Sequence, residues 1–268
     1  MKNTFGFIGT GNMGGAVAKA AAKAMQPEQI FLANRTAAKA EVLAAELGCK
    51  TVSAQEVARS CGYIILGVKP QMMADLLGGL APILAQREEK FVLVSMAAGL
   101  TMADIRTMAG GEYPVIRIMP NTPVAVGSGL IMYDTTENVS EEIKNQFLEN
   151  LRYAGMLDAL PEPLIDAGSA VAGCGPAFSA MFMEALADGG IACGLPRKKA
   201  LDYAAQMLLG TAKLALETGK HPGELKDAVC SPGGATIAGV RALEAHDFRG
   251  AAMAAVEAAF VRTKELGK

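Results

Sequence analysis

The chain has 268 residues, of which 51% are hydrophobic and 19% are charged, and its formal net charge at pH 7 is −2. This length allows one large domain or two ordinary ones with a substantial core, and the composition excludes an intrinsically disordered chain. Because the charge is close to zero and Lys and Arg are scattered, nucleic acid is not expected as a partner.

Cysteine and histidine usage argues against disulfides and metal. The five cysteines are odd in number and contain no C-x-x-C pair, which is typical of free thiols in a reducing compartment. The two histidines, His221 and His246, lack metal-ligand spacing, so no metal site is predicted. The N-terminus enters a strand pattern directly, without an apolar secretory segment. We therefore expect a cytoplasmic protein.

The residues between Asp166 and Glu184 form an uncharged stretch that is a candidate membrane span. It is shorter than the roughly 20 residues that cross a bilayer. Gly173-Cys174-Gly175-Pro176 is also expected to interrupt it. We expect a buried helix here and no membrane association.

Up to about residue 160, short apolar runs alternate with helical patterns such as Thr36–Leu47 and Gln71–Leu84. Near-continuous apolar strands that alternate with helices predict an α/β domain, residues 1–160, with a mostly parallel sheet and helices on both faces. The predicted strands are Thr4–Ile8, Gln29–Ala33, Lys50–Val52, Tyr63–Val68, Phe91–Ser95, Val115–Met119 and Gly129–Met132.

From Pro161 onward the strand patterns stop, and residues 161–268 are predicted to be all-α. The first helical pattern carries apolar residues nearly all round, including Phe178, Met181 and Phe182, so it should be buried on every side. A small helical domain cannot surround it alone, and we expect a second subunit to help. The predicted helices are Glu162–Cys193, Pro196–Thr218, Gly234–Ala245 and Phe248–Leu266.

A G-x-G-x-x-G turn follows the first strand and opens a helix. The first glycine permits the tight turn, the second lets the backbone approach a pyrophosphate, and the third allows close packing of helix and strand. Free N–H groups and the helix dipole then attract phosphate groups. In this βαβ context the turn predicts a dinucleotide site. Its residues are Gly9, Thr10, Gly11, Asn12, Met13 and Gly14.

The end of the second strand favours NADP over NAD. An NAD site would place Asp or Glu there to hold the ribose 2′-hydroxyl, but this chain has Asn34 and Arg35. A guanidinium can pair with a 2′-phosphate in bidentate fashion, whereas a carboxylate would repel it. The alternative is that Arg35 is a solvated loop residue and Asn34 a helix cap.

Two later strand ends should meet the same crevice, because ligands in open α/β sheets lie outside the carboxyl ends of the strands. Val68 and Lys69 close one strand, although Lys69 could be only a solvated surface lysine. Small residues follow Ser95, where a flat ring could lie. They are Met96, Ala97 and Ala98.

A second glycine turn, Ser231-Pro232-Gly233-Gly234-Ala235-Thr236, opens a helix in the carboxyl half. Free N–H groups at its start would bind a small carboxylate, and the hydroxyls of Ser231 and Thr236 can donate or accept hydrogen bonds. The alternative is an ordinary helix–helix connection with a serine cap.

No Lys, Arg or His lies between Arg152 and Arg197. Reduction of a ketone requires a proton for the developing alkoxide, usually from Lys or His. A protonated imine already carries its proton, so the scarcity of such residues favours reduction of C=N over C=O.

These residues carry a family resemblance over essentially the whole chain. The segments GFIGTGNMGGAV, GVKP, SMAAGLT, RIMPNTPVAVGSG, GCGPAF and KDAVCSPGGATIAGVRALE resemble pyrroline-5-carboxylate reductase, and SPGGAT is the most specific of them. The resemblance implies reduction of 1-pyrroline-5-carboxylate to L-proline, the last step of proline synthesis. It also implies a Rossmann domain followed by an α-helical dimerisation domain. Cys174 stands where the family often has serine, with little expected consequence.

The resemblance implies that the NADPH site comprises Gly9–Gly14, Asn34, Arg35, Val68, Lys69 and Met96–Ala98, with NADH a weaker alternative cofactor. It implies a substrate site of Ser231, Gly233, Gly234, Ala235 and Thr236. We predict that the Thr236 hydroxyl hydrogen-bonds the imine nitrogen as the catalytic residue, and the alternative is a simple helix cap. The sequence also allows two other functions, a hydroxyacid dehydrogenase of similar build and a non-catalytic dinucleotide-binding protein.

Overall fold

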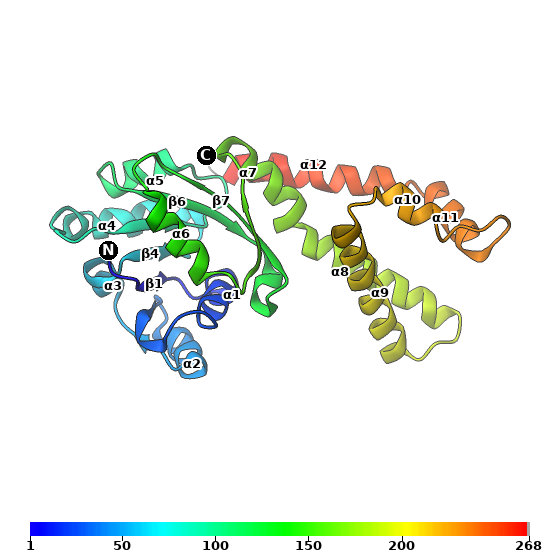
Figure 1. Ribbon diagram of the computed structural model, residues 1–268, viewed down its shortest axis with the longest axis horizontal. Helices are drawn as coiled ribbons and strands as arrows, with labels where there is room; N and C mark the ends of the chain where they lie inside the picture. The colour runs from blue at the N-terminus through cyan, green and yellow to red at the C-terminus, as the bar shows by residue number, and fades with distance from the viewer. Residues whose placement is uncertain (267–268) are drawn as a thin grey trace. The chain divides into compact units, whose positions relative to one another are not determined.

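The computed structural model describes residues 1–266 and divides the chain into two compact units (Figure 1). The first unit comprises residues 1–174 and residues 259–266 of the last helix. The second unit is Gly175–Ala258 and is entirely helical apart from its connections.

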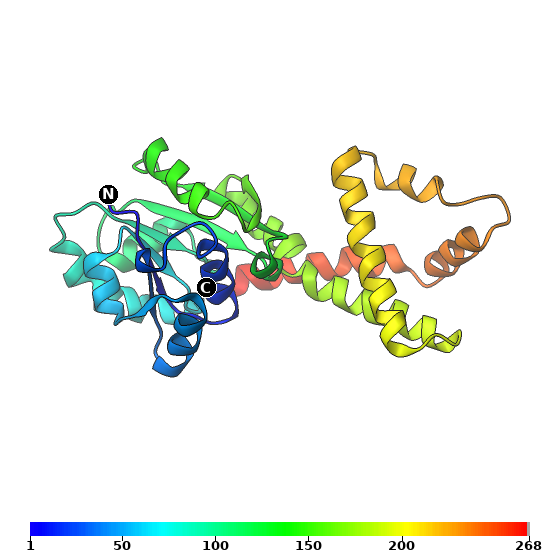
Figure 2. The ribbon, with the colours of Figure 1, turned by 60° about the horizontal axis from the view of Figure 1, so that its bottom comes forward.

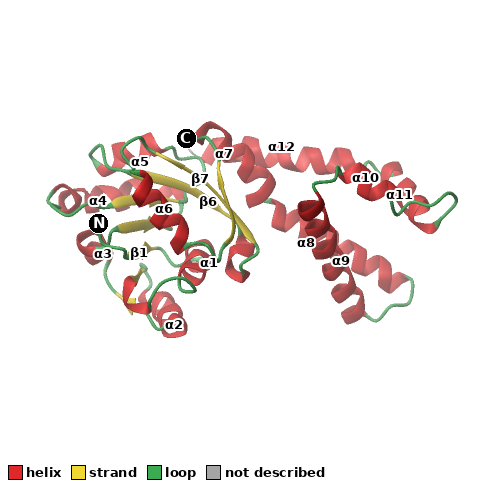
Figure 3. Ribbon diagram, viewed as in Figure 1, coloured by secondary structure: helices red, strands yellow, loops and turns green. Residues whose placement is uncertain are grey.

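The first unit is built on an eight-stranded sheet within residues 5–159, drawn in yellow in Figure 3. The strand order is β3-β2-β1-β4-β5-β6-β7-β8, and every neighbouring pair is parallel except β6 and β7. An order that runs outward from β1 in both directions is typical of a Rossmann fold and confirms the predicted fold class. The strands are β1 (Phe5–Ile8), β2 (Ile30–Ala33), β3 (Lys50–Thr51), β4 (Tyr63–Leu66), β5 (Val92–Ser95), β6 (Val115–Pro120), β7 (Gly129–Thr135) and β8 (Gly155–Ala159).

Helices cover both faces of this sheet, because successive strand side chains point to opposite sides. Phe5 and Phe7 of β1 pack on one side with α1, α2 and α6, where Phe5 stacks on Phe147 at 5.5 Å between ring centroids. Ile8 packs on the other side with α3, α4 and α5. The bounds are α1 (Asn12–Ala21), α2 (Ala37–Leu47), α3 (Ala54–Ser60), α4 (Met73–Ala85), α5 (Met102–Ala109) and α6 (Glu141–Asn150), with short 3-10 turns η1 (Pro27–Gln29), η2 (Pro70–Met72) and η3 (Thr122–Val126).

The predicted strands are all present, within a few residues at their ends, but one further strand lies outside the prediction. This is β8, with the sequence GMLDA, which pairs in parallel with β7 at the edge of the sheet. Its side chains are half-buried or exposed, so it lacks the continuous apolar run that identifies the central strands.

The segment predicted as one helix from Glu162 is helical throughout but irregular. It consists of α7 (Glu162–Gly168), a π-helical turn η4 (Ser169–Gly173) and α8 (Gly175–Ala192). The expectation that Gly173–Pro176 interrupts it was wrong, because the helix continues to Ala192. The π turn ends at Gly173, and Gly175 and Pro176 form the start of α8, where proline is tolerated. By length and composition alone, Glu162–Ala192 is also long and apolar enough to cross a membrane, and 11% of its most apolar window is buried within one chain.

A buried ion cluster holds α7 against the sheet. Arg117 on β6 is 2% exposed, and its guanidinium donates to Glu162 at 3.3 Å and to Asp166 at 2.6 Å. Glu162 also accepts the backbone N–H of Met102, at the start of α5. Just beyond β6, the Asn121 amide donates to a carbonyl oxygen of the π turn at 3.1 Å. These contacts fix the π turn beside the carboxyl end of β6.

The second unit leaves much apolar surface uncovered within one chain. Of α8, only Ala187 is buried, while Met181 is 69% exposed. Phe182 packs on Phe248 with 5.3 Å between ring centroids. Within the described residues, the remaining helices are α9 (Arg197–Thr218), α10 (Pro222–Asp227), α11 (Ala235–Ala245) and α12 (Phe248–Leu266).

Candidate functional site

The first glycine turn is packed so tightly that side chains are excluded from two of its positions. Gly9 has φ +104°, and a Cβ atom there would lie 2.5 Å from the carbonyl oxygen of Gly67, on the loop after β4. A Cβ atom at Gly14 would overlap the carbonyl oxygen of Gly9. Gly11, by contrast, has open space in front of its α-carbon. The three glycines therefore make a turn whose middle position stays accessible.

Helix α1 begins at this accessible position without a cap. Its N-cap residue is Gly11, no side chain accepts from its first N–H groups, and its first turn holds no acidic residue. Unpaired N–H groups and the helix dipole make such an end attractive to an anion.

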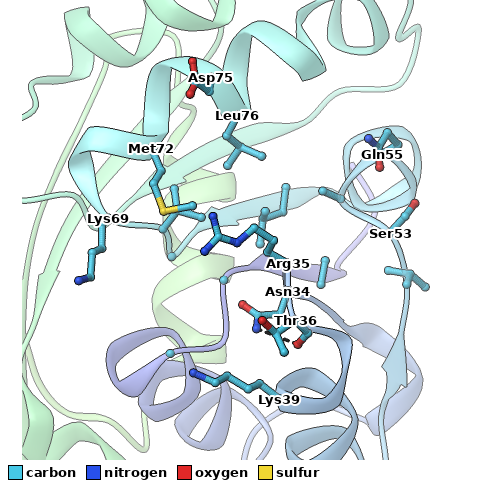
Figure 4. A pocket seen from close by; sticks show the side chains of 18 residues that line it. Asn34, Arg35, Thr36, Lys39, Ser53, Gln55, Lys69, Met72, Asp75 and Leu76 are labelled. Atoms are coloured by element: carbon cyan, nitrogen blue, oxygen red, sulfur yellow. Dashed lines mark hydrogen bonds between the residues drawn. The ribbon is translucent and has the colours of Figure 1, made fainter.

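A cavity of about 830 Å³ lies beside this turn (Figure 4). The carboxyl ends of β1, β2 and β4 converge on it. Of the predicted cofactor residues it brings together Gly9, Gly11, Asn34, Arg35, Val68 and Lys69. Its other lining residues are Ile8, Ala33, Thr36, Lys39, Val52, Ser53, Ala54, Gln55, Gly67, Met72, Asp75 and Leu76.

A second, more open cavity adjoins the first along α1 and shares Gly11 and Lys39 with it. Thr10 and Asn12 line this second cavity, where Lys19 and Glu46 form an ion pair of 2.7 Å. The Thr10 hydroxyl is buried without a hydrogen-bond partner among the described residues. The remaining predicted residues, Met13, Gly14 and Met96–Ala98, line neither cavity.

Asn34 joins the end of β2 to the glycine turn. Its side-chain oxygen accepts the Thr10 N–H at 3.4 Å, and its amide nitrogen donates to the Thr36 carbonyl at 3.0 Å. Thr36, not Asn34, is the N-cap of α2, so the helix-cap interpretation of Asn34 does not hold. Arg35 is exposed and points into the cavity (Figure 4).

The segment Met96–Ala98 after β5 is held in place by burial and by a hydrogen bond within the chain. Ala97 is buried, and its N–H donates to the Ser95 hydroxyl at 3.3 Å. Met96 and Ala98 are half-buried. This segment follows the carboxyl end of β5 as predicted.

The second glycine turn lies in the second unit and opens α11. Gly233 has φ +69° with no atom within 4 Å of the position of a Cβ, and the Gly234 N–H donates to the Ser231 carbonyl at 3.0 Å. A Cβ at Gly234 would overlap the Ser231 hydroxyl. The N-cap of α11 is Gly234, without a side-chain cap or an acid in the first turn. Neither Ser231 nor Thr236 caps this helix, and its N–H groups stay available.

The residues present fit a phosphate-containing dinucleotide. The glycine cradle, the uncapped α1 and the basic side chains of the cavity suit a pyrophosphate and a further phosphate group. Lys39, Met72 and Leu76 line this cavity but were missed from the sequence. Lys39 lies one helical turn beyond Arg35, a spacing that could have indicated it. Within residues 1–266, no group of three or more His, Cys, Asp or Glu side chains could hold a metal ion.

Comparisons with known proteins cover the full chain. Residues 162–266 match the family model described as pyrroline-5-carboxylate reductase dimerisation, and residues 4–99 match one described as NADP oxidoreductase coenzyme F420-dependent. The chain is 39% identical to a pyrroline-5-carboxylate reductase of Pisum sativum over 98% of its length and 96% of the relative. It is 38% identical to that of Escherichia coli over 100% of both chains.

A solved structure is also similar to this chain over its full length. The Plasmodium falciparum pyrroline carboxylate reductase, crystallised with NADP bound, superimposes with a TM-score of 0.90 at 31% identity and covers 100% of this chain and 99% of that one.

Proposed function

The chain belongs to the pyrroline-5-carboxylate reductase family, and we propose that it reduces the C=N bond of 1-pyrroline-5-carboxylate to give L-proline, the last step of proline biosynthesis, using NADPH. One observation carries the proposal from the structure. The same chain has two glycine turns that open helices with neither a side-chain cap nor an acid in the first turn. One suits a dinucleotide phosphate, and the other suits a small carboxylate.

The cofactor site is the cavity beside the first turn. Gly9–Gly14 would receive the pyrophosphate on backbone N–H groups, and Arg35 would pair with the 2′-phosphate. Val68, Lys69 and the Met96–Ala98 segment would line the rest of the cofactor. When bound, the cofactor supplies a hydride. NADH would be the weaker cofactor, because it gives Arg35 no phosphate partner.

The substrate site is the second turn. The N–H groups of Ala235 and Thr236 would hold the carboxylate, with the Ser231 hydroxyl beside them. The Gly234 N–H instead closes the turn on the Ser231 carbonyl. Gly233 keeps the turn in its left-handed conformation.

Thr236 would act on the ring nitrogen, which is bonded to the carbon that carries the carboxylate. Its hydroxyl oxygen would accept a hydrogen bond from the protonated imine and orient the C=N face. Threonine is too weak an acid to protonate the nitrogen unaided, so its role is to position and polarise. The absence of Lys, Arg and His from residues 153–196 suits a substrate that brings its own proton.

The family's dimerisation segment supports a homo-oligomer. We propose a homodimer or higher assembly in which Met181 and its apolar neighbours on α8 are covered by a second copy. The proposed domain boundary is at residue 160, shortly before the family match begins at residue 162. A cytoplasmic location, without membrane or nucleic-acid partners, belongs to the same proposal.

The proposal is tested by following the loss of NADPH absorbance with 1-pyrroline-5-carboxylate and, in parallel, with 2-keto acids. We expect turnover with the imine and none with the keto acids. No turnover with the imine, or comparable turnover with a keto acid, would overturn it.

A further inference from the structure

Two of the segments that carry the family resemblance belong to neither glycine turn. RIMPNTPVAVGSG covers β6 and the residues after it, and GCGPAF covers the end of the π turn and the start of α8. A hydrogen bond connects them. The side-chain amide of Asn121, in the first segment, donates to the carbonyl oxygen of Ala172, just before the second, at 3.1 Å.

The Ala172 carbonyl lies where an ordinary helix would leave it without a donor. In an α-helix it would accept the N–H of residue 176, which here is Pro176 and has no N–H. The proline ring also crowds the carbonyl four residues before it. The helix passes this point as a π turn and continues to Ala192 (Figure 2). Asn121 therefore supplies a hydrogen bond that Pro176 cannot.

Asn121 is itself held in place by β7. Its side-chain oxygen accepts the N–H of Leu130 at 2.9 Å, and its backbone N–H donates to the Leu130 carbonyl oxygen at 3.1 Å. Four residues earlier, Arg117 on β6 holds α7 through Glu162 and Asp166. The helix is thus tied to β6 at two points, before the π turn by the ion cluster and within it by Asn121.

The π turn lies at the half of the sheet edge where the nicotinamide would lie. Arg35, at the end of β2, marks the adenosine side of the proposed cofactor site, and the pyrophosphate turn follows β1. A dinucleotide that crosses this edge places its nicotinamide half beyond β1, toward β4, β5 and β6. There Ala98, after β5, and Ala172 pack against the same buried cluster, which is Met119, Met132 and Ile165.

We propose that Asn121 is a positioning residue for hydride transfer. By holding the Ala172 carbonyl, it fixes the π turn beside the Met96–Ala98 segment, and so fixes the surface on which the nicotinamide lies. Asn121 acts through the turn, because both ends of its side-chain amide are used within the chain. A displacement of about 1 Å is enough to slow a reaction about a hundredfold. This inference rests on the proposed NADPH-dependent reaction and adds a residue to it.

The experiment measures the fluorescence of bound NADPH without substrate, because the emission of the dihydronicotinamide increases when the ring is immobilised. In Asn121→Ser, the side chain is too short to reach the Ala172 carbonyl. We expect a smaller increase at saturation, with a Kd for NADPH within about twofold of the parent's, since Arg35 and the first glycine turn are unchanged. Hydride transfer to 1-pyrroline-5-carboxylate in a single turnover should slow about ten- to a hundredfold.

Two further variants isolate the bond to the π turn. Asn121→Asp keeps an acceptor for the Leu130 N–H and loses only the donor, so it should lower the fluorescence increase as Asn121→Ser does. Pro176→Ala restores a helical N–H for the Ala172 carbonyl. Added to Asn121→Ser, it should recover part of the fluorescence increase and part of the hydride-transfer rate.

Asn138→Ser is the matched control. The Asn138 amide also donates to a backbone carbonyl oxygen, that of Glu112, at 2.9 Å. Its side-chain oxygen accepts the hydroxyl of Thr136, which bonds the backbone of Val115 at the first residue of β6. This control therefore loses the same kind of bond at the opposite end of β6. Its NADPH fluorescence and hydride-transfer rate should equal the parent's.

Parental fluorescence and hydride transfer in both Asn121 variants would overturn the positioning role, even with a lower unfolding midpoint, because the role would then be purely structural. An equal effect of Asn138→Ser, or no recovery on adding Pro176→Ala, would overturn it too. If the parent does not reduce 1-pyrroline-5-carboxylate while the fluorescence differences appear as expected, the proposed reaction is wrong and the positioning of the nicotinamide stands.

Discussion

The two glycine turns of this chain are alike in sequence, because each is rich in glycine and opens a helix, but the atoms that surround them differ. At the first turn, Gly9 is pressed against the backbone of the loop after β4, and Gly14 is pressed against the backbone of Gly9. At the second turn, no atom lies within 4 Å of a Cβ placed on Gly233, and Ser231 through Gly233 are exposed. The first turn is completed by its own chain. The second is open within one chain.

This difference shows that two similar motifs can be held in place by different interactions. Fixing the first turn requires the sheet, so its disruption should cost folding free energy. Fixing the second turn requires only local backbone conformation, so its disruption should cost function first.

The largest effect is expected at Gly14. In Gly14→Ala, the new methyl group meets the carbonyl oxygen of Gly9, and neither backbone can move without shifting β1 or α1. We expect a loss of about 3 kcal/mol or more in the free energy of unfolding, measured by urea denaturation. Gly11→Ala is the control, because the space in front of Gly11 is open. It should unfold like the parent and bind NADPH more weakly; equal stability of both variants would contradict the comparison.

At the second turn, Thr236→Ala should lower kcat about ten- to a thousandfold, the effect of losing one well-placed hydrogen-bonding group. NADPH binding and the unfolding midpoint should stay unchanged, since Thr236 is exposed and does not cap α11. Thr236→Ser should retain most activity. Parental turnover of Thr236→Ala at saturating substrate would show that the assignment is wrong.

The exposed apolar face of the second unit leads to a prediction about assembly. A charge at Met181, which is 69% exposed in one chain, should be buried unpaired if a second copy covers α8. Light scattering should show at least a dimer for the parent, and Met181→Asp should raise the dissociation constant about tenfold or more. Val126→Asp, at a similarly exposed valine of η3 in the first unit, should assemble normally. A parent that is active as a monomer would refute this prediction.

A buried thiol that packs against Gly6 of β1 leads to a prediction about pH. Burial raises the pKa of Cys61 from 9.0 to about 11, despite a hydrogen bond with Ser60. Because the folded chain holds this proton more tightly, its contribution to stability is complete below about pH 9 and is lost as the pH rises to 11. It amounts to about 2 to 3 kcal/mol.

Unfolding measured between pH 8.5 and 11 should therefore show a shallower loss of stability in Cys61→Ala than in the parent. Burial also raises the pKa of Tyr63, which both proteins keep, so the difference between them isolates Cys61. Identical pH profiles would rule out this contribution.

The sequence by itself determined the features that depend on nearby residues. Apolar runs identified the central strands because these strands are buried on both faces, as β1 and β4 are. The turn at Gly9–Gly14 and the basic residue at position 35 were likewise visible within a few residues of a strand end. The longer helices of the second unit followed from the 3.6-residue pattern, and α12 begins and ends where it was expected. The short helix α10 lay outside the prediction.

Only the tertiary structure decided which side chains meet. Lys39, Met72 and Leu76 reach one cavity because α2 and the η2–α4 segment both begin at the carboxyl edge of the sheet, after β2 and β4. The same folding buries Arg117 between Glu162 and Asp166, and it forms a π turn just before the glycine-proline segment that predicted a break. Local periodicity cannot encode such contacts, because they join residues that are far apart in the chain. The distance between these residues is fixed only when the strands of the sheet pair.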